Sequence, residues 1–133
     1  MVSAFGNIYV LANPAMPGLV KIGKSRPASA SRAYQLSKNT AVPADFRVIF
    51  SERVYDCDSV ELFLKRELAR HRYSKNREFF ALQPELAAKW VAALLVIARE
   101  RERSFTAQLS PVGRALYEVR RSRGEPPLRS PLR

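Results

Sequence analysis

The sequence predicts an α/β (α+β) fold with a small three-stranded antiparallel sheet, flanked by helices and extended by an added C-terminal helix. Two short β-forming runs, 7–11 and 19–23, flank the turn-forming segment ANPAMPG, and this arrangement predicts a hairpin. Residues 46–55 alternate apolar and polar side chains, which predicts a third strand. Apolar residues then recur at helical spacing within 58–72 and 84–103.

The remaining elements of the first two thirds of the chain are predicted from local signals. Residues 27–38 predict a short helix whose serines offer N-caps. Asp58 is expected to cap the next helix, which would run to about Arg72. Residues 76–80 predict a loop or a short strand before the long helix that opens at Pro84.

The C-terminal third is predicted to be helical and then irregular. The long helix should cover 84–103, and a serine followed by proline should open a basic amphipathic helix at 110–121. The last ten residues, GEPPLRSPLR, hold three prolines and predict a disordered tail. We therefore expect a domain at 1–83, a packed helix at 84–103, and a basic helix with a Pro/Arg-rich tail at 104–133.

The composition excludes several classes of protein and points to a polyanionic partner. Hydrophobic residues make up 47% of the chain, which excludes a wholly disordered or collagenous protein. The 23 Lys and Arg residues exceed the 12 Asp and Glu residues, giving a net charge of +11. An excess of this size favours nucleic acid as the partner. A single cysteine and a single histidine exclude an internal disulfide and a zinc site built from such residues.

The sequence shows no sign of a membrane partner. Its longest apolar run, 91–98, has eight residues. A spanning helix needs about 20 residues. The N-terminus also lacks the basic and apolar regions of a signal peptide, so we expect a cytoplasmic protein.

A set of chemistry-bearing residues follows the predicted elements in order. Asn7-Ile8-Tyr9-Val10 lies in the first strand and Val20-Lys21-Ile22-Gly23 in the second. Arg32 lies in the following helix, Glu61 early in the next helix, and Glu78 in the segment REFF. This order resembles the GIY-YIG nuclease superfamily, and within it the phage-type branch whose second half-motif reads KIG.

The resemblance covers roughly residues 5–82 and implies a GIY-YIG-type endonuclease that hydrolyses DNA phosphodiester bonds with Mg²⁺ (or Mn²⁺). Such a reaction must deprotonate the attacking water and offset the charge that builds on the phosphate oxygens. The resemblance assigns Tyr9 to the attacking water, Arg32 to the phosphate and Glu61 to the metal. Lys24 and Asn76 are expected to contact nucleic acid.

Each assignment has an alternative in the residues themselves. Tyr9 could be a packed strand residue, and as a phenol with an ordinary pKa near ~10 it needs a neighbouring cation to become a useful base. Lys21, Lys24 or Arg32 could supply that cation. Glu61 ends a capping-box pattern that begins at Asp58, so it could cap a helix instead of binding metal. Glu78 is the rival metal ligand.

Two positions depart from the resemblance and keep an alternative function open. Lys21 stands where the wider superfamily has its second tyrosine, and Lys65 stands near a position where the branch often has histidine. Both leave open a catalytically weak or inactive GIY-YIG-fold module that only binds nucleic acid.

The basic C-terminal third could extend the contact with DNA. Residues 104–133 hold six arginines and two glutamates. They could bind DNA phosphates with little sequence selectivity, act as a solubility tail, or dock a protein partner through 110–121. A partner protein could supply target specificity, and the oligomeric state stays open. The arginines expected to contact nucleic acid are Arg114, Arg120 and Arg121.

Overall fold

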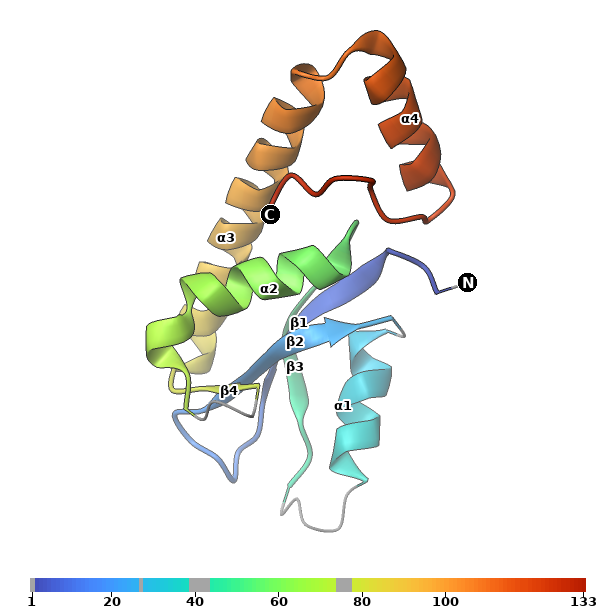
Figure 1. The fold of residues 1–133 in the computed structure, drawn as a ribbon. Helices are drawn as coiled ribbons and strands as arrows, with labels where there is room; N and C mark the ends of the chain where they lie inside the picture. Colours follow the sequence, from blue (N-terminus) through green and yellow to red (C-terminus); the bar gives the residue numbers. More distant parts are fainter. Residues whose placement is uncertain (1, 27, 39–43, 74–77) are drawn as a thin grey trace.

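The computed structural model describes residues 2–26, 28–38, 44–73 and 78–133 (Figure 1). It opens with two strands, alternates helices and strands as far as the fourth strand, and ends with two helices. The elements are β1 (Gly6–Ala12), β2 (Val20–Ser25), α1 (Ser29–Ser37), β3 (Arg47–Val54), α2 (Cys57–Glu67), the 3₁₀ turn η1 (Ala69–His71), β4 (Phe79–Phe80), α3 (Pro84–Ala107) and α4 (Pro111–Ser122).

The four strands form one antiparallel sheet in the order β3-β1-β2-β4. The predicted α+β class and all three predicted strands are confirmed. The fourth strand, β4, occupies part of 76–80, where the sequence predicted a loop or a short strand. It exists because Phe79 and Phe80 pair with the start of β2, next to Lys21 and Val20.

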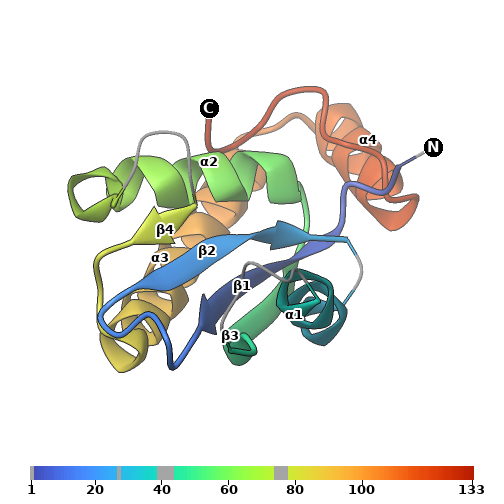
Figure 2. The same cartoon turned by 90° about the horizontal axis from the view of Figure 1, so that it is seen from below.

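The two faces of the sheet have different roles. Ile8 and Val10 of β1 point into the main core, which α2 and α3 cover (Figure 2). Tyr9 and Leu11 point to the opposite face, which α1 covers. This alternation follows from the period-two geometry of a strand. It turns Tyr9 toward the helix that carries Arg32.

The start and end of α2 differ from the prediction. The helix begins at Cys57 with Asp56 as its N-cap residue, so the predicted capping by Asp58 is wrong. Asp56 adopts a left-handed φ of 54°, which turns the chain sharply from β3 into the helix. The helix ends at Glu67 and a 3₁₀ turn follows, because the chain must bend back here to bring β4 beside β2.

The C-terminal third forms the two predicted helices and a packed tail. The helix α3 covers the predicted range and runs four residues beyond it, to Ala107. The helix α4 begins as predicted, and Ser110 caps it by accepting a hydrogen bond from the Gly113 amide at 3.1 Å. The tail lacks helix and strand, but the predicted disorder is wrong. Leu132 is buried against the main core, and its carbonyl accepts a hydrogen bond from Arg66 at 3.1 Å. Within the described ranges, no helix has the length and apolar content needed to cross a membrane.

Candidate active site

The centre of the candidate site is a small space beside Gly23. Gly23 lies opposite Tyr9 in the β1–β2 register, so both residues belong to the same face of the sheet. A Cβ atom at Gly23 would lie 2.6 Å from Glu78 Oε2 and 2.7 Å from the Tyr9 hydroxyl oxygen. The missing side chain therefore provides the room in which the Tyr9 hydroxyl and the Glu78 carboxylate meet.

Glu78 connects this hydroxyl to two lysines. Its Oε2 accepts a hydrogen bond from the Tyr9 hydroxyl at 3.2 Å and lies 3.4 Å from Lys21 Nζ. Its Oε1 lies 3.5 Å from Lys65 Nζ. Burial raises the pKa of the Glu78 carboxyl, but the charges of Lys21 and Lys65 outweigh burial, so the pKa falls below its usual value. Glu78 is therefore ionised at neutral pH.

The Tyr9 hydroxyl is neutral and covered in this structure. Burial and the charge of Glu78 raise the pKa of Tyr9 to about 12, although a hydrogen bond and the charge of Arg32 act in the opposite direction. The expectation that neighbouring cations would lower this pKa is therefore wrong. Lys21 directs its charge to Glu78, and the whole Tyr9 side chain is shielded from solvent. Tyr9 thus acts as a hydrogen-bond donor here.

Arg32 also interacts with the Tyr9 hydroxyl. It lies in α1, is half-buried, and hydrogen bonds with the Tyr9 oxygen. The helix packs against β1 through Ala33, which joins Tyr9 and Phe46 in one apolar cluster. The structure thus brings together Tyr9, Lys21, Arg32 and Glu78, as expected for the first three. The sequence indicated Glu78 only as a metal ligand, and its contact with Tyr9 was missed.

Glu61 binds the backbone and the side chain of Lys24 in β2. Its Oε2 accepts a hydrogen bond from the Lys24 backbone amide at 3.0 Å, and its Oε1 lies 3.2 Å from Lys24 Nζ. β4 pairs only with the start of β2, so this carboxylate satisfies a strand amide beyond the end of β4. The capping-box alternative is wrong, because the carboxylate faces β2 and no side chain caps α2.

Lys65 links the two carboxylates. Its Nζ lies 3.7 Å from Glu61 Oε1 and 3.5 Å from Glu78 Oε1. Lys21 and Lys24 pair with the same two carboxylates from β2. With Arg32, the described cations of this cluster outnumber its two glutamates, so the site favours an anion such as phosphate.

The oxygen donors of the cluster suit a hard cation. Mg²⁺ binds through one or two carboxylates and keeps several waters, and Glu61 and Glu78 offer two carboxylates around one point. A metal at that point would require the Lys65 ammonium to move aside. Among the described residues, no group of three or more His, Cys, Asp or Glu side chains forms a dedicated metal cage.

Most of the other predicted contact residues are not part of this cluster as described. Asn76 lies outside the described residues. Arg114 donates to the carbonyls of Thr106 and Ala107, and Arg120 pairs with Glu125 at 3.1 Å. Arg121 lies over the ring of Phe5. All three arginines belong to α4, which the structure does not bring to Tyr9 (Figure 1). Lys24 does lie beside the site, bound to Glu61.

All residues of this cluster fall within one family domain. Residues 6–95 match the T5orf172 domain, which is more than half of the chain. The chain belongs to the T5orf172 domain family. This domain is found in phage and nuclease-like proteins, in loose agreement with the GIY-YIG resemblance. No curated protein and no solved structure matches the chain. The match covers the first half of α3, so the second half of α3 and all of α4 lie beyond the T5orf172 match.

Proposed function

We propose that this T5orf172 protein is a GIY-YIG-type endonuclease that hydrolyses DNA phosphodiester bonds with Mg²⁺ (or Mn²⁺). The observation that supports the proposal is the meeting of the Tyr9 hydroxyl, Arg32 and Glu78 beside Gly23. The family domain and the net charge of +11 favour the same substrate class. A partner protein would supply target specificity.

Arg32 is the proposed ligand of the scissile phosphate. A guanidinium can donate two parallel hydrogen bonds to phosphate oxygens and remains charged at any working pH. In the structure, Arg32 bonds with the Tyr9 hydroxyl. Transfer of its N–H groups to the phosphate would place positive charge where the transition state gathers negative charge. Lys21, 13% exposed, lies close enough to Glu78 to assist at the same place.

Tyr9 is the proposed proton relay, acting together with Glu78. When Arg32 turns to the phosphate, the Tyr9 oxygen loses one donor and can accept a hydrogen bond from the attacking water. Its own proton already points to Glu78 Oε2, so this carboxylate can receive it as the water proton arrives. A phenolate base would be scarce at neutral pH because the pKa of Tyr9 is raised to about 12.

Glu61 is the proposed metal ligand, with Glu78 as the second carboxylate. Both carboxylates approach Lys65 Nζ, so withdrawal of this ammonium would leave two oxygen donors around one point. A bound Mg²⁺ would supply charge stabilisation at the leaving oxygen. Lys24 keeps Glu61 oriented through the backbone hydrogen bond of 3.0 Å.

A second function, DNA binding without cleavage, is favoured by two specific observations. The Tyr9 side chain has no exposed surface. Lys65 also lies between the carboxylates that would hold the metal. A site fixed in this arrangement would attract phosphate but lack access for the attacking water.

Cleavage of supercoiled and branched DNA tests the two functions. The full chain is incubated with Mg²⁺, Mn²⁺ or EDTA, alongside Arg32→Ala and the matched control Arg123→Ala, which removes an exposed arginine at the end of α4. Metal-dependent nicking that is lost only in Arg32→Ala supports the endonuclease. Absence of nicking, with binding that weakens steeply as salt rises, supports the binding module.

A further inference from the structure

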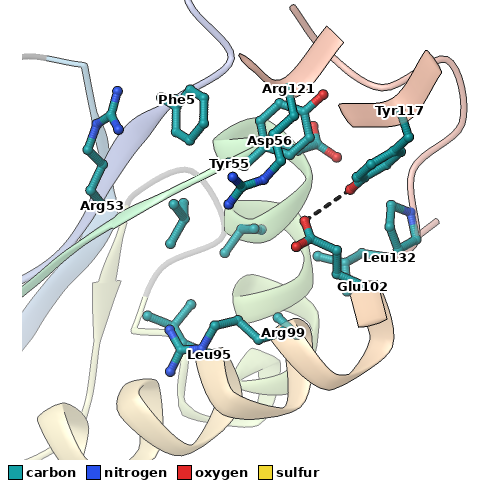
Figure 3. Close-up of a pocket in the computed structure, with 14 residues that line it drawn as sticks. Phe5, Arg53, Tyr55, Asp56, Leu95, Arg99, Glu102, Tyr117, Arg121 and Leu132 are labelled. Carbon is teal, nitrogen blue, oxygen red and sulfur yellow. Dashed lines mark hydrogen bonds between the residues drawn. The ribbon is translucent and has the colours of Figure 1, made fainter. Parts of the chain in front are cut away.

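A second cavity lies away from the Tyr9 site and shares none of its residues. Its volume is about 340 Å³, and it lies among the end of β3, the start of α2, the helices α3 and α4, and the C-terminal tail (Figure 3). This volume is at the lower end of the range for small-molecule sites, about 300–1,000 Å³. The apolar part of its lining includes Val54, Val60, Leu95, Ala98 and Leu132.

One wall of the cavity combines aromatic rings with arginines. The Arg53 and Arg121 guanidinium carbons lie 4.2 and 5.5 Å from the centroid of the Phe5 ring (Figure 3). The ring of Tyr55 lies 5.2 Å from that of Phe5, centroid to centroid. Within the described part of the chain, neither guanidinium has a carboxylate at ion-pair distance, although both line the cavity. Stacked guanidiniums retain in-plane N–H groups for an anion.

Two of the other charged groups of the cavity have partners. Arg99 pairs with Glu52, which lies outside the cavity. Glu102 accepts a hydrogen bond from the Tyr117 hydroxyl at 3.0 Å (Figure 3). Arg53 and Arg121 are therefore the positive groups of the lining that no carboxylate pairs with in the described residues, whereas Glu102 keeps its negative charge.

Asp56 adds an acceptor that lacks a donor. It lines the cavity, and its Oδ2 is buried without a hydrogen bond from any described residue. Ser59 and Ser130 hydrogen bond with the carboxylate, yet burial dominates and raises its pKa. A buried acceptor without a donor is costly. The cavity therefore combines unpaired guanidiniums, an apolar surface and one acceptor that needs an N–H group.

We infer that this cavity binds a nucleotide unit. Arg53 and Arg121 hold the phosphate beside Phe5, the base lies over the apolar lining, and an amino group of the base donates to Asp56. An inorganic anion would use the arginines but leave Asp56 and the apolar surface unused. A nucleotide combines a phosphate, a flat ring and an N–H donor. The inference does not rest on the proposed hydrolysis of DNA.

Titration of the full chain with mononucleotides tests the inference. AMP, CMP, UMP and inorganic phosphate are added while the ring signals of Tyr55 and Tyr117 are followed by NMR. AMP or CMP should shift both rings and bind at least about tenfold more tightly than phosphate, because base contacts add to the charge contacts. Equal binding of phosphate, or unchanged ring signals with every nucleotide, would overturn the inference.

Two substitutions and one control locate the contacts. Arg121→Gln should weaken AMP binding about tenfold or more, because it removes a charge-assisted donor. Arg123→Gln removes the same charge two residues away, outside the lining, and should leave affinity unchanged. Asp56→Asn keeps a residue type that tolerates positive φ, so the fold should persist. The advantage of AMP and CMP over inorganic phosphate should fall, because a neutral amide accepts the base N–H less strongly than a carboxylate does. Equal losses in Arg121→Gln and Arg123→Gln would reduce the effect to general charge and refute the site.

The same chemistry could come from a free nucleotide or from an unpaired nucleotide of a strand. A 5′-phosphorylated single-stranded oligonucleotide distinguishes these sources. Displacement of AMP by the oligonucleotide, with loss in Arg121→Gln, assigns the site to a strand. AMP binding that persists in excess oligonucleotide assigns it to free nucleotides. Both results support nucleotide binding, and both can be obtained whether or not the Tyr9 site cleaves DNA.

Discussion

Gly23→Ala should disrupt the Tyr9–Glu78 contact without adding or removing a charge. The new Cβ would lie 2.6 Å from Glu78 Oε2 and 2.7 Å from the Tyr9 hydroxyl oxygen. Ordinary van der Waals contact begins at about 3.5 Å, so these atoms must separate by roughly 1 Å. Because both are held by further partners, we expect the 3.2 Å hydrogen bond between them to break. Loss of a hydrogen bond to a charged group costs about 1.5–3 kcal/mol.

The assay compares the nicking rate, the affinity for DNA and the melting temperature of Gly23→Ala with those of the unchanged chain. A misplacement of about 1 Å at a catalytic centre can lower the rate about 100-fold. Affinity for DNA should change little because Lys21, Lys24 and Arg32 remain. Gly113→Ala is the matched control, since its Cβ would approach only Ser110 and Leu109, in the turn before α4. A Gly23→Ala protein that nicks DNA at the original rate would refute the proposed relay.

Three further predictions concern protonation, metal affinity and the tail. The pKa of Tyr9 is about 12 in the folded chain, above its ordinary value of about 10. The neutral phenol therefore contributes its full stabilisation below about pH 10, and this stabilisation is lost as the pH rises toward 12. Tyr9→Phe should flatten this part of the plot of melting temperature against pH. Lys65→Ala removes the ammonium near Glu61 and Glu78, so the affinity for Mn²⁺ should rise about tenfold. Electron paramagnetic resonance measures this binding, and an unchanged affinity would argue against a metal between these two carboxylates. Leu132→Ala should lower stability in denaturant unfolding by about 2–3 kcal/mol, whereas a disordered tail would give no change.

The sequence predicted the elements that local patterns determine. The turn-forming segment between two β-rich runs placed β1 and β2, and a serine–proline pair placed the start of α4. The strand period put Tyr9 on one face, and the short connection from β2 to α1 brought Arg32 to the same face. These relations depend on geometry within a few residues of each other in sequence or register.

Other features depend on contacts between distant segments, and local patterns carry no signal for them. The pKa of Tyr9 depends on Glu78, 69 residues away, which pairs with Lys21 and so keeps the lysine charge from favouring phenolate. Glu61 matched a capping pattern, yet its partner is the Lys24 amide left open by the short β4. A composition rich in proline predicted a disordered tail, but Leu132 reaches the core, and Tyr55 and Arg66 donate hydrogen bonds to tail carbonyls.

The same distant contacts explain how lysine can replace tyrosine in the second half-motif. Lys21 lacks the phenol expected at this position, but its Nζ lies 3.4 Å from Glu78 Oε2. The same carboxylate accepts a hydrogen bond from the Tyr9 hydroxyl. In the absence of DNA, the lysines neutralise both carboxylates. A DNA phosphate would compete for Lys21 and Lys65, because its oxygens also accept charge-assisted hydrogen bonds from ammonium groups. Under the proposed function, the phosphate would thereby release Glu78 and Glu61, so DNA and a divalent cation should bind with positive coupling. If the metal had to bind before DNA, the two carboxylates would need to be free of lysine. In this structure Glu61 and Glu78 are both in ion pairs with lysines.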